Sequence, residues 1–141
     1  MTDFYDTSVL VAAFWADHPS HGSCLRLLAG ARPETSACCA HSLAEVYAVT
    51  TRMPVKPRVL PEQAMLFIGN IRERLSIVAL NSEEYTHALQ ASAVRGIVGG
   101  AIYDAMLAQC ALKAQAETIF TWNLRHYSQC GPEVVGRVRT P

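Results

Sequence analysis

Apolar residues along the chain form short runs that alternate with longer segments of helical periodicity. The short runs cover residues 4–5, 35–40, 76–80 and 118–120. Runs of this length are typical of buried strands in a parallel sheet. The segments between them are long enough to hold the helices that connect parallel strands. The pattern therefore predicts an α/β domain, with helices on both faces of a central parallel sheet.

Proline, glycine and capping residues set the predicted ends of the helices. We expect helices from about residue 8, over 21–30, 42–52 and 61–74, then from the Asn81 cap to about residue 95, and from Gly100 to about residue 116. Asn81 and Glu84 have the spacing of a capping box, and Pro61 suits a first helical turn. We expect residues 121–127 to form a polar loop and residues 134–138 to form a last strand.

The composition is that of one folded domain. The chain has 141 residues, and 50% of them are hydrophobic, which is enough for a packed core. We see no signal-peptide pattern and no apolar run of membrane-spanning length, so we expect a soluble, cytoplasmic protein that does not act in a membrane. The five cysteines lack zinc-site or C-x-x-C spacing, so we expect small, reduced, buried core residues.

The charge balance does not indicate a polyanionic partner. Lysine plus arginine and aspartate plus glutamate number 12 each. Locally, Arg52, Lys56 and Arg58 follow one another without an intervening acid, and such a cluster could contact phosphates. A solvated surface is the alternative, and we favour it for these residues.

Three acids stand in apolar surroundings and near predicted sheet edges. Asp6 ends the first strand, Glu45 lies in the helix after the second strand, and Asp104 lies early in the helix before the fourth strand. In a parallel α/β sheet, these positions share one edge, which is where ligands bind. Each acid also has a structural alternative: Asp6 as a helix cap, Glu45 as the capping-box partner of Ser42, and Asp104 as a complement to a helix dipole.

Three ionised carboxylates at close range repel one another unless a cation lies between them. Oxygen ligands without a cysteine or histidine partner suit Mg²⁺ or Mn²⁺. The segment after the fourth strand reaches the same edge, and its Thr121 and Asn123 offer neutral oxygens. Its Arg125 and His126 could meet a phosphate, although we favour an ordinary polar turn for both residues.

These residues, taken in order, resemble a PIN domain. The resemblance rests on Asp6-Thr7-Ser8, Glu45 in Ala-Glu-Val-Tyr, Asp104 in Tyr-Asp-Ala, and Thr121-Trp122-Asn123. Within that family, the chain is most similar to the VapC-like toxins of bacterial toxin–antitoxin pairs. The resemblance covers residues 1–141 as a single PIN domain, and it implies a three-layer α/β/α fold with a four- or five-stranded parallel sheet.

The resemblance implies a Mg²⁺- or Mn²⁺-dependent ribonuclease that cleaves single-stranded or looped RNA and leaves 5′-phosphate and 3′-hydroxyl ends. Its acidic centre would be Asp6, Glu45 and Asp104. As a hypothesis, Asp6 and Asp104 bind the metal directly, whereas Glu45 binds through water or orients the attacking water. Supporting hydrogen bonds would come from residues beside these acids, namely Thr7, Ser8, Thr121 and Asn123.

Asn123 departs from the family pattern, because many PIN domains have a fourth acid there. We include Asn123 in the catalytic set and expect at most one well-occupied metal in the RNA-free protein. The alternatives are a non-catalytic PIN-like module that binds RNA or protein, an Asp-nucleophile phosphatase, which Ser8 argues against, and an interaction module whose acids are only caps. We also expect a homodimer and a cognate antitoxin as partners.

Overall fold

The computed structural model describes residues 1–141 and contains one parallel sheet of five strands in the order β3-β2-β1-β4-β5. The strands are β1 (Asp3–Tyr5), β2 (Ser36–Cys39), β3 (Ser76–Val78), β4 (Thr118–Phe120) and β5 (Val138–Arg139). The predicted α/β class and the central parallel sheet are confirmed.

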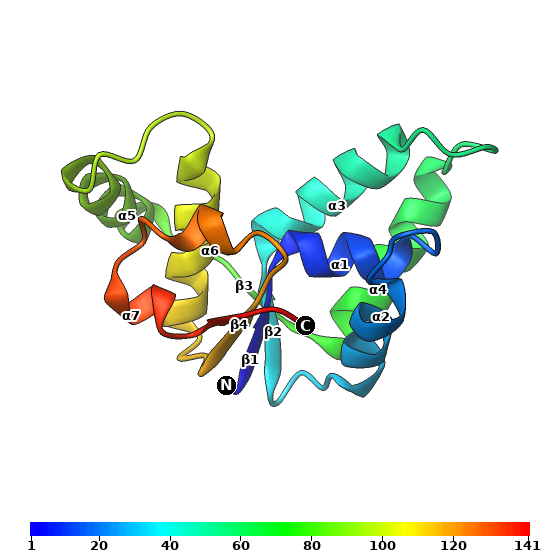
Figure 1. The fold of residues 1–141 in the computed structure, drawn as a ribbon, viewed down its shortest axis with the longest axis horizontal. Coiled ribbons are helices and arrows are strands. Elements are labelled where there is room, and N and C mark those ends of the chain that lie inside the picture. Colours follow the sequence, from blue (N-terminus) through cyan, green and yellow to red (C-terminus); the bar gives the residue numbers. More distant parts are fainter.

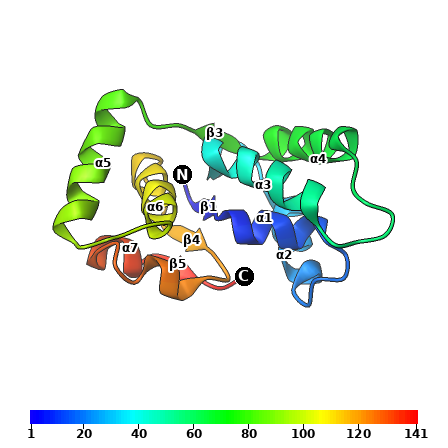
Figure 2. The ribbon, with the colours of Figure 1, turned by 90° about the horizontal axis from the view of Figure 1, so that it is seen from above.

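Helices cover both faces of this sheet (Figure 1). One face carries α1 (Thr7–Phe14), α2 (His21–Gly30), α3 (Ala40–Arg52) and α4 (Pro61–Arg74). The other side carries α5 (Ser82–Val94), α6 (Ala101–Lys113) and α7 (Pro132–Val135). Seen from above in Figure 2, the strands lie between the two groups, so the domain has three layers.

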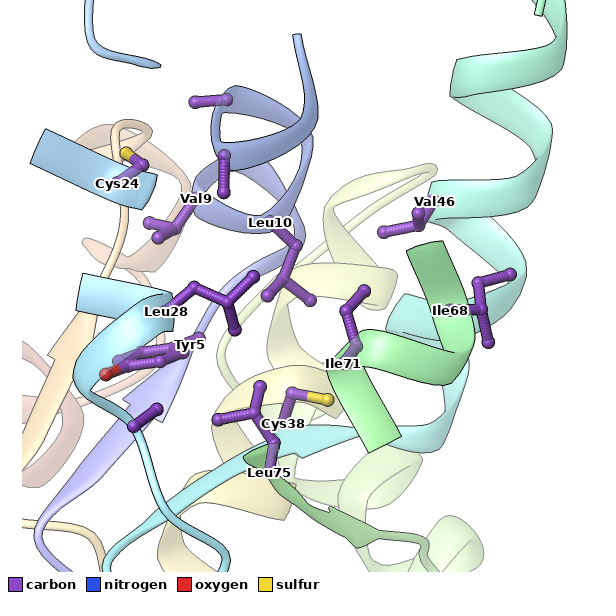
Figure 3. Packing of buried hydrophobic residues seen from close by; sticks show 13 residues of the cluster. Tyr5, Val9, Leu10, Cys24, Leu28, Cys38, Val46, Ile68, Ile71 and Leu75 are labelled. Carbon is purple, nitrogen blue, oxygen red and sulfur yellow. The ribbon is translucent and has the colours of Figure 1, made fainter. Parts of the chain in front are cut away.

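The alternation of side chains along β1 explains why both faces are covered. Phe4 and Tyr5 are both buried, and neighbouring residues of a strand point to opposite faces. Tyr5 belongs to a core cluster with Leu10 and Leu28, which Figure 3 shows from close by. Phe4 belongs to a second cluster that includes Leu107 of α6. A strand that is apolar on both sides requires helices on both sides.

The strand order places a crevice at the end of β1. The chain adds β2 and then β3 on one side of β1, and later returns to place β4 and β5 on the other side. Ligands of open α/β sheets bind where the order reverses in this way, beyond the carboxyl ends of the strands. Asp6 directly follows β1 and therefore lies at this point.

Two predictions near the C-terminus were wrong. Residues 134–138 do not form one strand, because Pro132 opens the short helix α7 and β5 begins only at Val138. Proline suits the first turn of a helix, and buried Val134 anchors that turn in the second core cluster. The predicted polar loop contains a 3₁₀ helix, η1 (Leu124–Tyr127), which ends on a buried tyrosine.

Helix α3 begins earlier than the sequence pattern predicts. Its first residue is Ala40 and Cys39 occupies the cap position, so Ser42 lies inside the helix and does not cap it. The capping-box alternative for Glu45 is therefore excluded, and Glu45 lies in the second turn. The capping box of Asn81 and Glu84 at the start of α5 is present as predicted.

The cysteines are all free, and four of the five are buried, with Cys130 half-buried. The burial of four cysteines confirms the predicted core role for them, and Cys130 is the exception. None of the helices combines the length and the apolar character that crossing a membrane requires.

Candidate active site

A cavity of about 860 Å³ opens at the carboxyl edge of the sheet. Four parts of the chain contribute to its lining: α1 with the residues just after it, α3 with the residues just after it, the first turns of α6, and the segment after β4. Asp6, Glu45 and Asp104 all line it, together with Thr7, Ser8 and Asn123. The structure therefore brings the three acids of the sequence analysis to one place, although they are far apart in the chain.

Asp6 is held by a set of hydrogen-bond donors. Its Oδ2 accepts hydrogen bonds from the backbone N–H of Ser8 at 3.1 Å, from the Ser8 hydroxyl at 2.6 Å and from the Thr121 hydroxyl at 3.0 Å. Its Oδ1 accepts a hydrogen bond from the hydroxyl of Tyr127 at 2.5 Å. Asp6 is also the N-cap of α1, so it caps a helix and lines the cavity at the same time.

Tyr127 is a site residue that the sequence analysis missed. Its side chain is buried, and burial together with the nearby charge of Asp6 raises its pKa well above the usual value of 10.0. The phenol therefore stays protonated at neutral pH and remains a permanent donor to Asp6. The only signal in the sequence was an aromatic residue at the end of a segment of mixed polar and apolar residues.

Glu45 is oriented by neighbours on α1 and α3. The Thr7 hydroxyl donates to its Oε1 at 3.0 Å and also lies 2.9 Å from the hydroxyl oxygen of Ser42. Nε2 of His41, one turn earlier on α3, lies 3.7 Å from the same carboxylate oxygen. The His41 ring stacks on Tyr103 of α6 with centroids 5.4 Å apart, which connects the two helices beside the cavity.

Asp104 is half-buried and has a histidine partner. Burial raises its pKa above the usual 3.8, and the charges of Asp6 and Glu45 raise it further. The nearby His126 acts in the opposite direction, with its Nδ1 3.0 Å from Oδ2 of Asp104. His126, for which we favoured an ordinary turn, thus lies in the site. Arg125 is exposed and does not line the cavity.

Asn123 lines the cavity without joining this network. Its backbone N–H donates to the Thr121 hydroxyl at 2.9 Å, but its exposed side-chain amide has no hydrogen-bond partner in the protein. The amide is therefore free to face a ligand. Thr121 is completely buried and connects the Asn123 backbone to Asp6.

The donor set fits a hard divalent cation. The acids contribute only carboxylate oxygens, and no lysine or arginine forms an ion pair with them. No group of three acidic, histidine or cysteine side chains is close enough to enclose a metal by itself. Mg²⁺ tolerates this, because it keeps several waters and is usually held by one or two carboxylates and a substrate phosphate. Burial raises the pKa of Asp104 most, the charges of Asp6 and Glu45 raise it further, and a bound cation would relieve this repulsion among the acids.

Comparison with known proteins identifies the family of this fold and site. The PIN domain family matches residues 4–130. Ribonuclease VapC27 of Mycobacterium tuberculosis is 34% identical over 113 residues, which are 79% of this chain and 78% of that protein. Ribonuclease VapC40 of the same organism is 33% identical over 120 residues, 85% of either chain.

Solved structures show the same fold at lower sequence identity. VapC20 of Mycobacterium tuberculosis, described as a sarcin–ricin loop cleaving toxin, superposes with a TM-score of 0.66 at 19% identity and covers 84% of this chain and 87% of its own. VapBC2 of Rickettsia felis, solved with a promoter DNA fragment, superposes with a TM-score of 0.67 at 22% identity. The match covers 100% of this chain and 99% of that chain. With its sheet, its acidic cavity and these relatives, the chain belongs to the PIN-domain family, in the group of the VapC ribonucleases.

Proposed function

We propose that this protein is a metal-dependent endoribonuclease and the toxin of a toxin–antitoxin pair. The observation that carries the proposal is the meeting of Asp6, Glu45 and Asp104 in one cavity at the carboxyl edge of the sheet. The VapC ribonucleases among its relatives support RNA as the substrate. The proposed RNA is single-stranded or looped, because bases and backbone are accessible there.

In this proposal, Asp6 and Asp104 hold Mg²⁺ or Mn²⁺. When bound, the ion supplies water activation and neutralises charge on the scissile phosphate. Hydroxyl groups of Ser8, Thr121 and Tyr127 fix the Asp6 carboxylate in one orientation. Glu45, held by Thr7, orients the attacking water, and the reaction leaves 5′-phosphate and 3′-hydroxyl ends.

The proposal is tested by RNA cleavage with Mn²⁺, with and without a chelator. Asp6→Asn should abolish cleavage and leave the fold intact, because asparagine is also a good N-cap. Asp17→Asn is the matched control, since Asp17 is an exposed acid that does not line the cavity. Equal cleavage by the wild type and Asp6→Asn would refute the metal-ligand role, and cleavage that persists in chelator would refute metal dependence.

The proposed partners are a cognate antitoxin and a second copy of the chain. One solved relative is a VapBC complex, which supports an antitoxin partner for this toxin. Exposed apolar side chains lie at the start and along the outer face of α4, namely Leu60, Met65 and Leu66. Uncovered apolar surface of this kind supports an interface, and we assign it to the second copy of the chain.

A further inference from the structure

The cavity extends past the carboxylates as a groove between α1 and α3. We call this extension the distal groove and define it by Val11, Trp15, Val49, Arg52, Met53 and Pro54. Val11 lies on α1 and Trp15 directly follows that helix. Val49 and Arg52 lie three residues apart on α3, so they share one face of it, and Met53 and Pro54 directly follow. The distal groove contains no acidic side chain, in contrast to the end that holds the three carboxylates.

Arg52 is the charged residue of the distal groove. It is exposed, it forms no ion pair within the protein, and it lies in the last turn of α3. Because it follows Glu45 by seven residues on the same helix, it lies about 10 Å farther along the groove. Lys56 and Arg58 follow in the next loop, and both are also exposed and unpaired. The distal end is therefore cationic and the proximal end acidic.

Trp15 forms the aromatic wall of the distal groove. The residue is half-buried, and its ring packs edge-on against His18 with centroids 5.9 Å apart. Its Nε1 is the one buried side-chain nitrogen or oxygen atom in the protein without a hydrogen-bond partner. Because Trp15 lines the cavity, its ring offers an apolar surface on which the flat face of a base can stack.

We propose that the distal groove binds the RNA nucleotide next to the scissile phosphate, with its base against Trp15 and its phosphate on Arg52. The proposal rests on the ribonuclease function and adds a substrate-binding subsite to it. Continuity with the acidic cavity and charge complementarity both favour RNA. The distance of about 10 Å along α3 from Glu45 to Arg52 is roughly the reach of one or two unstacked nucleotides.

The first test measures binding of a fluorescein-labelled, mixed-sequence single-stranded RNA by anisotropy in EDTA, so that the metal-dependent reaction does not proceed. Loss of one phosphate contact should lower the slope of log affinity against log salt by about 0.7 and weaken binding about fourfold at 0.15 M salt. We expect both effects for Arg52→Gln. The matched control Arg58→Gln removes an exposed charge outside the cavity and should change both quantities less.

The second test follows Trp15 directly. The chain has two tryptophans, so Trp122→Phe leaves Trp15 as the only indole, and stacking of a base should quench its fluorescence. Trp15→Leu should weaken binding about 5- to 150-fold, the usual cost of losing one stacked base. Trp15→Phe keeps an aromatic face and should bind much closer to wild type, which separates stacking from a general loss of folding.

Equal affinities and salt slopes for Arg52→Gln and Arg58→Gln, or no quenching of Trp15, would overturn the proposal. It would also be overturned if the variants bound RNA normally and lost only the binding of a protein partner. A wild-type protein that binds RNA through Arg52 and Trp15 but never cleaves it would remove the ribonuclease function and leave the RNA groove in place.

Discussion

At the scale of single residues, Asp6 shows that a cap and a site residue are compatible roles. The carboxylate caps α1 by accepting from the Ser8 N–H, and three hydroxyl groups bind it as well. These donors fix its rotamer before any ligand arrives, which is what a preorganised site requires. The cap places Asp6 at the carboxyl edge, and the hydroxyl groups give it one orientation toward the cavity.

Tyr127→Phe should weaken Mn²⁺ binding and RNA cleavage about 10- to 100-fold, the usual cost of losing a group that orients a metal ligand. The reason is that Oδ1 of Asp6 loses its donor, so the carboxylate is less well fixed. Tyr5→Phe is the matched control, because it removes another tyrosine hydroxyl that bonds only the carbonyl of Leu27. Calorimetry and cleavage rates that are equal for the two variants would show that Tyr127 serves only the core.

Asn123→Asp should tighten binding of a second Mn²⁺ ion. The unmodified cavity has three acids, and a first divalent ion already cancels two negative charges, so a second ion meets little remaining charge. We expect one well-occupied site at most in the RNA-free protein, measured by titration calorimetry. Two tight sites in the unmodified protein would contradict the argument, and unchanged stoichiometry in the variant would mean that Asn123 only supports its loop.

At the scale of elements, the apolar strands and the Asn81 cap were predictable, whereas the start of α3 and the short C-terminal turns were not. A strand such as β1 is followed directly by Asp6, so the end of the apolar run located a site residue. The contact of Tyr127 with Asp6 depends on η1, a single 3₁₀ turn. This turn is too short to show a hydrophobic periodicity in the sequence. The prediction of a strand at 134–138 was wrong because Pro132 favours a helical turn. An alternation of apolar and polar residues cannot be judged over so few positions.

The start of α5 allows a test of stability that is separate from function. The Asn81 side chain accepts from the N–H of Glu84 at 2.9 Å, and the Glu84 carboxylate accepts from the N–H of Asn81 at 2.8 Å. Asn81→Ala should therefore lower the free energy of unfolding by about 1 kcal/mol, measured by urea denaturation.

RNA cleavage by folded Asn81→Ala should be unchanged, because neither capping residue lines the cavity. Thr86→Ala is the control on the same helix, since its exposed hydroxyl bonds only a carbonyl one turn earlier. A loss of cleavage that exceeds the loss of folded protein would contradict the separation of α5 from the site.

At the scale of the whole molecule, the site lies where the two helical layers meet at the sheet edge. Asp6 and Glu45 come from one layer, whereas Asp104 comes from α6 in the other. His41 and Tyr103 stack across the same junction. Any change in how the layers sit on the sheet would therefore alter the distances among the acids, which makes packing of both core clusters a requirement for activity.

The outer face of the α1–α4 layer leads to the last prediction, a homodimer that buries α4. Leu66 is 72% exposed there, with exposed Met65 beside it, so two large apolar side chains are uncovered in the single chain. Leu66→Glu should raise the dimer dissociation constant about 100-fold or more, because a symmetric interface loses the burial of this leucine twice. Thr86→Glu introduces the same charge on exposed α5, in the other layer, and serves as the control.

Light scattering should show a dimer for the wild type and the control and a monomer for Leu66→Glu. A wild type that stays monomeric at high micromolar concentration would contradict the dimer, and a Leu66→Glu protein that remains dimeric would place the interface elsewhere.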